Sequence, residues 1–331
     1  MYACAAVFAA GTLPAHAAAT PATLTLYAGQ HQQMVRLVVK AFEQQTGIPV
    51  KVRYGEGPEL ANAIILEGKR TPADLYFTEN SPELMRLQEK QLLAPVAPAT
   101  LQQIPAHDSS AKGDWVGVVA RENVLTYNPK LIQASALPKS LLDLADPKYK
   151  GKVAIAPTDS DFLPLVRIMA VKYGRARTLK WLRALKQDAQ LFQDDEGVAA
   201  AVHKGAAAFG DINDYYYYRL REQVGKRHMV SRVYHFRHGD PGGLINVSGA
   251  AVLRYAHHPA EAQKFLAFLV SAKTQTLLAQ STVDFEYPLR PGIAANPQLK
   301  PLSQLQPPQI TVEQLGNDDE ALQLLQEAGV L

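Results

Sequence analysis

The chain has 331 residues, of which 47% are hydrophobic and 20% are charged, and its formal net charge is +3. This is the composition of a globular protein long enough to form two domains with separate cores. The net charge is too small, and the Lys and Arg residues too scattered, to indicate a nucleic-acid partner. No stretch approaches the ~20 apolar residues that a membrane span needs.

The first 17 residues are typical of an export signal. Residues 5–13 are mostly apolar, and Ala15-His16-Ala17 forms a small-residue cleavage site before Ala18. No Lys or Arg precedes Arg36, so either the true start lies upstream or the signal is atypical. A buried N-terminal strand is the alternative, but the abundance of alanine argues against it. We therefore predict a signal peptide over residues 1–17.

Cys4 is the only cysteine and lies within this predicted signal. The mature chain would then contain no thiol, which excludes disulfides and thiolate metal sites. Any metal site must use oxygen and nitrogen ligands, and these favour harder ions than a thiolate site would.

Strands and helices alternate along the rest of the chain, which predicts an α/β fold with largely parallel sheets. The first series has expected strands over residues 24–28, 50–54 and 74–78 and helices over residues 32–45, 58–67 and from residue 80 or 81 onward. The second series has expected strands over residues 152–156 and 206–212 and helices over residues 162–171 and 178–186. Two β-rich stretches, residues 115–127 and 229–252, are expected to carry the chain between two lobes.

Four consecutive tyrosines, Tyr215 to Tyr218, stand at the predicted start of a helix, although the whole chain has only 14 tyrosines. Two adjacent phenols at a helix N-terminus suit a hard, highly charged metal ion. Such an ion displaces the phenol proton, which is otherwise lost only near pH ~10. The open N–H groups and partial positive charge of the helix terminus also favour the phenolate. The alternative is ordinary packing with hydroxyls at the surface.

Ligands of α/β folds bind beyond the carboxyl ends of the strands. This rule selects His31 after the first strand, Glu79 after the strand that ends at residue 78, and Tyr215 with Tyr216 after the strand that ends at residue 212. A neutral imidazole, a carboxylate and two phenolates suit a hard octahedral ion. Taken alone, a His at such a place is more often a helix cap and a Glu a solvated charge. Their common placement at strand ends carries the prediction.

The chain resembles the periplasmic ferric-ion-binding proteins of bacterial iron ABC transporters, which belong to the extracellular solute-binding proteins. Similar order and spacing run from about Leu24 to the C-terminus. The segments that carry the resemblance are Leu26-Tyr27-Ala28-Gly29-Gln30-His31, Thr71-Pro72-Ala73-Asp74, Phe77-Thr78-Glu79, Ile212-Asn213-Asp214-Tyr215-Tyr216, Arg237-His238-Gly239-Asp240-Pro241-Gly242 and Ser248-Gly249-Ala250-Ala251-Val252-Leu253.

The resemblance implies a two-lobed periplasmic-binding-protein fold. Each lobe is a mostly parallel sheet flanked by helices, and crossover hinge strands join the lobes. We expect residues 18–122 and 246–296 in the N-terminal lobe and residues 123–245 and 297–331 in the C-terminal lobe. The family's iron ligands fall on His31, Glu79, Tyr215 and Tyr216.

The function that the resemblance implies is capture of ferric iron in the periplasm and its delivery to an inner-membrane permease and the associated ATPase. The protein is expected to act as a monomer. Two phenolates and one carboxylate sum to −3 and balance Fe³⁺ beside a neutral His31, whereas ferrous iron or zinc would leave the site at −1. We therefore expect preference for ferric iron and its release when acid protonates the ligands.

Many members of this family complete the metal's coordination with a bound anion, often phosphate, and this chain departs from that pattern. The anion loop aligns with residues 157–162 and places Asp159, together with Asp195, where neutral polar residues are usual. Each carboxylate would repel a phosphate about 4 Å away by roughly 1–4 kcal/mol. We expect carbonate held by Arg121, water, or Asp159 itself in place of phosphate. The residues expected at the anion position or around the metal ligands are Asn80, Arg121, Asp159, Ser160, Asp195 and Asn213.

Three alternatives to this interpretation stay open. Asp159 would have no role in the cleft if it caps the helix at Phe162 and points away. The same fold would serve a different solute, such as an oxyanion, a polyamine or an organic ferric chelate. A mononuclear non-haem iron oxygenase typically uses two His and one carboxylate, whereas this set has one His and two Tyr, so we expect no enzymatic activity.

Overall fold

The computed structural model describes residue 1 and residues 22–331, so the predicted signal peptide falls outside the described residues except for Met1. The strands are β1 (Leu24–Gly29), β2 (Val50–Tyr54), β3 (Leu75–Thr78), β4 (Val116–Tyr127), β5 (Val153–Ile155), β6 (Gln190–Leu191), β7 (Phe209–Asn213), β8 (Arg232–Tyr234), β9 (Ile245–Val252) and β10 (Tyr287–Pro288). The helices are α1 (Gln32–Thr46), α2 (Gly57–Glu67), α3 (Ser81–Glu89), α4 (Pro98–Leu101), α5 (Phe162–Tyr173), α6 (Arg175–Asp188), α7 (Asp195–Lys204), α8 (Asp214–Val224), α9 (Pro259–Leu269), α10 (Ala272–Gln280), α11 (Val312–Leu315) and α12 (Asp319–Ala328).

All the strands form one hydrogen-bonded network in which parallel strands lie on both sides of an antiparallel centre. The order along the main path is β2-β1-β3-β9-β4-β7-β5-β6, and β8 and β10 both pair with β4. The pairs of β1 with β2 and β3 are parallel, as are the pairs of β5 with β6 and β7. The predicted parallel sheets are therefore present, but the strands that cross between them join the two sheets into one path.

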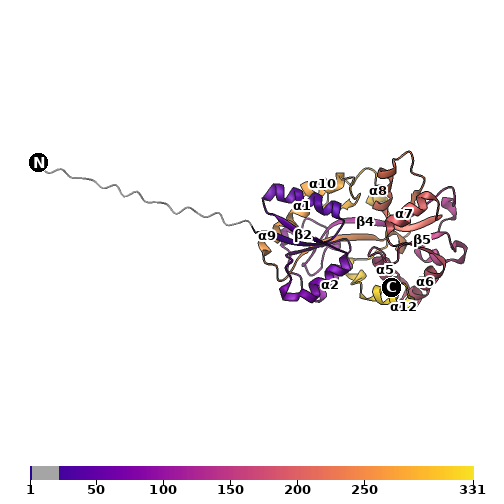
Figure 1. The fold of residues 1–331 in the computed structure, drawn as a ribbon, viewed down its shortest axis with the longest axis horizontal. Coiled ribbons are helices and arrows are strands. Elements are labelled where there is room, and N and C mark those ends of the chain that lie inside the picture. The colour runs from indigo at the N-terminus through magenta and orange to yellow at the C-terminus, as the bar shows by residue number, and fades with distance from the viewer. Residues whose placement is uncertain (2–21) are drawn as a thin grey trace.

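Strand β4 connects the two halves of the molecule. Its first part, residues 116–122, pairs with β9, and its second part, residues 123–127, pairs with β7. Figure 1 shows β4 running between a group of elements that includes α1, α2, α9 and α10 and a second group that includes α5, α6, α7 and α12. The stretches expected to cross between lobes match β4 and, in the second case, β8 and β9.

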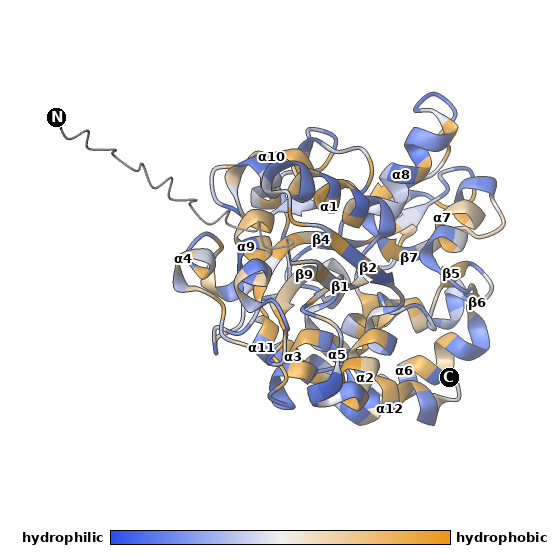
Figure 2. Cartoon of the chain, turned by 60° about the vertical axis from the view of Figure 1, so that its left-hand side comes forward, coloured by the Kyte–Doolittle hydropathy of each residue, from blue (hydrophilic) through white to orange (hydrophobic). Residues whose placement is uncertain are grey.

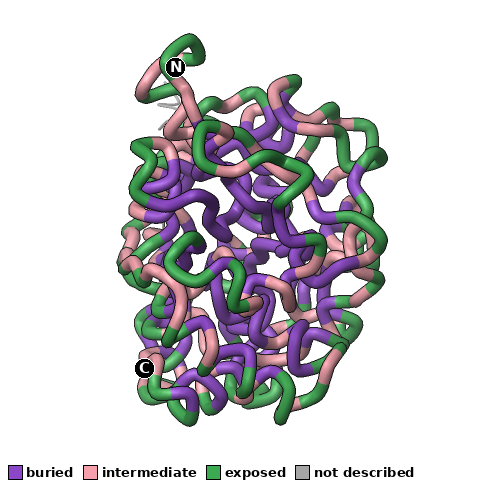
Figure 3. The backbone as a smooth tube through the Cα atoms, turned by 90° about the vertical axis from the view of Figure 1, so that its right-hand side faces the viewer, coloured by how far each residue is buried: buried purple, intermediate pink, exposed green. Residues whose placement is uncertain are grey.

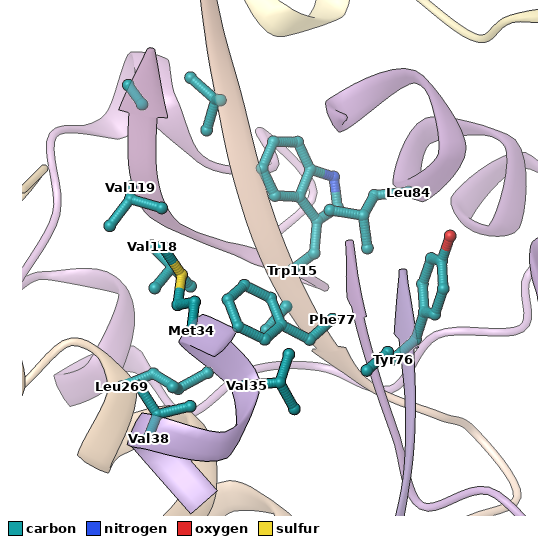
Figure 4. Close-up of a cluster of buried hydrophobic side chains, with 14 of the residues drawn as sticks. Met34, Val35, Val38, Tyr76, Phe77, Leu84, Trp115, Val118, Val119 and Leu269 are labelled. Carbon is teal, nitrogen blue, oxygen red and sulfur yellow. The ribbon is translucent and has the colours of Figure 1, made fainter. Parts of the chain in front are cut away.

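Hydrophobic residues fill two cores, and the first extends from the first half into α7 and α8 of the second. Helix α1 buries Met34, Val38 and Phe42 in the first core. Figure 4 shows Met34 beside Phe77 of β3 and Val38 beside Leu269, while the neighbouring Tyr76 points to the opposite face of the strand, as alternation along a strand requires. The second core is built around α5, α6 and α12. The helices carry both hydrophobic and hydrophilic residues (Figure 2), and the exposed segments lie mainly at the periphery (Figure 3).

Helix α7 was not expected from the sequence, although its ends carry ordinary helix signals. The Asp194 side chain accepts a hydrogen bond from the Gly197 N–H at 2.7 Å, and Gly205 ends the helix with φ of 84°. An Asp cap and a left-handed Gly are common at the two ends of a helix. This helix matters for function because it begins at Asp195, next to the anion loop.

We predict that Leu269→Ala lowers the free energy of unfolding by about 2–5 kcal/mol, because it removes buried methyl groups and leaves a cavity. Leu269 is 0% exposed in the first core (Figure 4), whereas Leu66 on α2 is 81% exposed. The matched variant Leu66→Ala is expected to change this free energy by less than ~0.5 kcal/mol. Urea unfolding of both variants measures the difference, and equal effects would contradict the assignment of the core.

Candidate metal site between the two halves

The structure brings the four predicted metal ligands together. His31 lies between β1 and α1, Glu79 follows β3, and Tyr215 and Tyr216 occupy the first turn of α8 directly after β7. The ring centroids of His31 and Tyr215 are 4.6 Å apart, and those of Tyr215 and Tyr216 are 4.2 Å apart. His31 Nε2 lies 3.2 Å from Glu79 Oε1. Side chains from both halves of the molecule therefore converge on one place.

These four side chains are largely removed from water, and burial sets their protonation. Burial, assisted by the positive charge of Arg219, lowers the pKa of His31 to about 3, so its imidazole is neutral. Burial and the neighbouring Asp161 carboxylate raise the pKa of Glu79 and of both tyrosines well above their ordinary values. These three oxygen groups consequently hold their protons more tightly than they would in water.

Asp161 is the site residue that the sequence analysis missed. It precedes α5, is 3% exposed, and accepts hydrogen bonds from Arg121 Nη2 and from the Tyr215 hydroxyl, both at 2.8 Å. Asn80 Nδ2 lies 3.4 Å from the same carboxylate. Although burial opposes ionisation, the Arg121 guanidinium holds the pKa of Asp161 below its usual range. The sequence signal was the Asp-Ser-Asp run, in which the carboxylate nearer the helix was not considered.

Arg121 is fully buried on β4 and is held by several neighbours. Its guanidinium donates to Ser248 Oγ at 3.0 Å and to Asn80 Oδ1 at 2.7 Å, and it also contacts the backbone carbonyl of Glu79. The guanidinium is thus fixed at the point where β4 passes between the two halves. Arg121 and Asn80 lie where the anion site was predicted, but their partner in the structure is Asp161.

Asp159 and Asp195 are engaged with backbone groups. Asp159 accepts hydrogen bonds from the N–H groups of Asp161 at 3.1 Å and of Asp195 at 3.2 Å, and Asp195 accepts one from the Asn213 N–H at 3.1 Å. Burial raises the pKa of Asp159 to about 7 and that of Asp195 well above its ordinary value. The Asp159 side chain does not cap α5, as the alternative required, but bonds to the N–H groups of the residue before α5 and of the first residue of α7. Both carboxyl groups hold protons more readily than a free Asp does. Their repulsion of a phosphate is therefore weaker than the repulsion expected from two full negative charges.

The remaining predicted neighbours contribute less. Ser160 lies half-buried on the same turn as Asp159. The Asn213 side chain is buried, and neither its nitrogen nor its oxygen has a hydrogen-bond partner within residues 22–331. In that same part of the chain no group of three or more His, Cys, Asp and Glu residues is arranged to hold a metal ion. A metal at this place therefore depends on the tyrosines.

The site communicates with solvent through a pocket of about 370 Å³. His31, Glu79, Tyr216 and Arg219 are among the residues that line it. A small ion thus has a path to the converging ligands.

The matching family model is that of the bacterial extracellular solute-binding proteins, over residues 38–307. This chain belongs to that family. It is 36% identical to the "Fe(3+)-binding periplasmic protein" of Serratia marcescens, over 96% of this chain and 93% of that one. It is also 36% identical to the "Major ferric iron-binding protein" of Neisseria meningitidis, over 95% of each chain.

The fold comparison agrees with the sequence comparison. A crystal structure of iron-bound HitA from Pseudomonas aeruginosa superposes with a TM-score of 0.90 and is 42% identical, covering 93% of this chain and 100% of that one. The predicted resemblance and the two-lobed α/β fold are therefore confirmed. Among the described residues, no helix is both long enough and apolar enough to cross a membrane.

We predict that the His31 imidazole of the metal-free protein stays neutral down to about pH 3, because burial opposes its protonation. An NMR titration, with His31→Gln to assign the signal, measures this pKa against those of exposed histidines such as His107. The unfolded chain protonates His31 near pH ~6.5, so its contribution to stability is lost as the pH falls from there towards 3. A His31 signal that titrates near 6.5 would contradict the buried arrangement.

Proposed function

We propose that this protein captures ferric iron in the periplasm and delivers it to an inner-membrane ABC permease and its ATPase. The observation that carries the proposal is the meeting of Tyr215 and Tyr216 from one half with His31 and Glu79 from the other. The names of the related proteins from Serratia and Neisseria support the same ligand. The proposal is for a monomeric binding protein that catalyses no reaction.

The chemistry of the four ligands favours ferric over ferrous iron. Two phenols and one carboxyl group lie beside a neutral imidazole, and in their ionised forms they supply three negative charges to the bound cation. A bound trivalent ion makes the site neutral, whereas a bound divalent ion leaves the site with a net charge of −1. Because the ligands must ionise, binding releases protons, and acid weakens it.

Closure would occur between the lobes assigned from the sequence, residues 18–122 with 246–296 and residues 123–245 with 297–331. Strand β4 exchanges its pairing partner at residues 122 and 123, within its continuous run. We place the hinge at this point of β4 and at the point where the chain returns in β9. Small changes of backbone angles at such points allow the domains of two-domain binding proteins to close. Iron bound by ligands from both lobes favours the closed arrangement.

Asp161 takes the role of the anion in this proposal. Its carboxylate already bonds to Arg121 and Tyr215. It therefore occupies the place beside Arg121 that the sequence analysis assigned to carbonate. An ionised group supplied by the chain itself needs no capture of an anion from solution. Iron binding should then be independent of both carbonate and phosphate.

We predict that titration of the metal-free protein with ferric citrate produces a broad visible phenolate-to-iron band that saturates at one equivalent. Tyr215→Phe and Tyr216→Phe should weaken the band and lower the affinity by more than the ~10–100-fold that is typical for loss of an outer-shell partner. Tyr217→Phe is the matched control, because it lies in the same tyrosine run but is only half-buried and outside the site. No band, and no iron retained after desalting, would end the ferric interpretation.

We further predict that the wild-type affinity for ferric iron is unchanged when bicarbonate or phosphate is added to anion-depleted buffer. Asp161→Ala should bind iron more weakly and regain affinity, by about tenfold or more, when either anion is added, because the freed Arg121 guanidinium can hold it. Asp159→Ser should stay independent of the anions, since Asp159 bonds to backbone N–H groups. A wild-type affinity that rises with bicarbonate would sink the role given to Asp161.

A further inference from the structure

We propose that Asp284 is a positioning residue for His31. Its carboxylate accepts a hydrogen bond from the Nδ1–H of the imidazole, and this fixes the ring so that Nε2 faces the ferric ion. The inference rests on the proposed function, in which His31 is a metal ligand. It concerns a residue outside the four ligands and outside the anion position.

The two nitrogens of the His31 ring face different groups. Nε2 is 3.2 Å from Glu79 Oε1, inside the proposed metal site, and Nδ1 is 3.5 Å from Asp284 Oδ1. An imidazole that binds a metal through one nitrogen almost always donates the other N–H to a carboxylate, a carbonyl or water. Asp284 is the carboxylate on that second side.

The hydrogen-bonding needs of this pair support the assignment. His31 Nδ1 and both carboxylate oxygens of Asp284 are buried and lack a hydrogen-bond partner anywhere in residues 22–331. Asp284 is only 2% exposed. Buried polar atoms without partners are rare and unfavourable. An approach of a few tenths of an ångström would join the donor nitrogen to the acceptor oxygen and satisfy both.

The other groups around Asp284 hold it in place. Burial raises the pKa of Asp284, and the Met34 backbone N–H in the first turn of α1 opposes this rise without forming a full hydrogen bond. Arg219 Nη1, from α8 in the other half, lies 4.0 Å from Asp284 Oδ1. The Asp284 carboxylate therefore lies between the helix that follows His31 and the helix that carries the tyrosines.

The backbone next to Asp284 is strained. Phe285 has a φ of 48°, in the left-handed region that is unusual for a bulky side chain. Its ring is 1% exposed and lies 5.6 Å from that of Tyr218. Strain of this kind persists where surrounding contacts determine the conformation, and it gathers at functional sites. Phe285 stands between Asp284, which lies 3.5 Å from His31, and Glu286, which lies 3.5 Å from the amide nitrogen of Gln30.

A double-mutant cycle tests whether Asp284 acts through His31. The affinity for ferric iron, measured by competition with citrate, is compared among the wild type, Asp284→Ala, His31→Ala and the double variant. Asp284→Ala should lower the affinity by about 10–100-fold in the wild-type background. It should cause no further loss when His31 is already absent. An equal loss in both backgrounds, or no loss in either, would overturn the proposal.

Pulsed EPR supplies a second measurement that a merely structural role would not change. The coupling of ferric iron to imidazole nitrogen should weaken in Asp284→Ala while the visible phenolate band persists. Asp284→Asn, which keeps an acceptor oxygen without the charge, should restore part of the coupling and tests the proposal if the alanine variant does not fold. Unchanged coupling in both variants would overturn it.

Asp318→Ala is the matched control. Asp318 is 0% exposed, and its carboxylate oxygens also lack hydrogen-bond partners within the described part of the chain, but it lies beside Arg86 and contacts no proposed ligand. Its removal should leave the nitrogen coupling intact. Failure of the proposed function would appear separately, as the absence of a phenolate band in the wild type.

Discussion

The buried ion pair between Arg121 and Asp161 joins the two halves of the molecule at their centre. Both side chains are almost fully removed from water, where an unpaired charge would be strongly unfavourable. The pair is tolerated because hydrogen bonds satisfy its members: Arg121 also donates to Ser248 and Asn80, and Asp161 accepts from Tyr215. Charge-assisted hydrogen bonds of this kind are stronger than neutral ones. The geometry of the candidate site depends on this pair, because it fixes Tyr215 relative to the strand that crosses between the halves.

The position of the pair in the fold explains its importance. Arg121 lies on the part of β4 that pairs with β9, and two residues later the strand pairs with β7. Asp161 comes from the loop before α5 in the other half. Separation of the halves would break the attraction and hydrogen bonds of this pair but would return both charges to water, so the two contributions oppose each other. The pair therefore fixes the geometry of the closed arrangement, and the bound metal supplies the preference for it.

The sequence predicted the four candidate ligands because each follows a strand. His31 and Glu79 follow β1 and β3, which are neighbouring parallel strands that end at one edge. The tyrosine pair follows β7 in the other half, and it meets the first pair because β7 runs in the opposite direction and its end faces theirs. The motifs of a known family supplied the rest of the fold. Asp161 could not be separated from Asp159 in this way, since both lie on one turn and only the fold decides that one carboxylate meets Arg121 while the other meets backbone N–H groups. Asp284 was beyond sequence reasoning altogether, because its contact with His31 arises from packing between distant segments and from a left-handed Phe285.

The division of the ligands between the halves gives the proposed transport protein a means of release without acid. When the halves separate, His31 and Glu79 leave with one half, and Tyr215 and Tyr216 stay with the other. Water then reaches the two phenols, whose ordinary pKa near ~10 means that protons compete strongly with the metal at neutral pH. The burial that protects the phenolates in the closed arrangement is thus lost in the same movement that removes two ligands. A permease that binds the open arrangement more tightly than the closed one would draw iron from the protein by shifting this equilibrium. The ratio of its two affinities must offset the stability of the bound metal together with that of the Arg121–Asp161 contact.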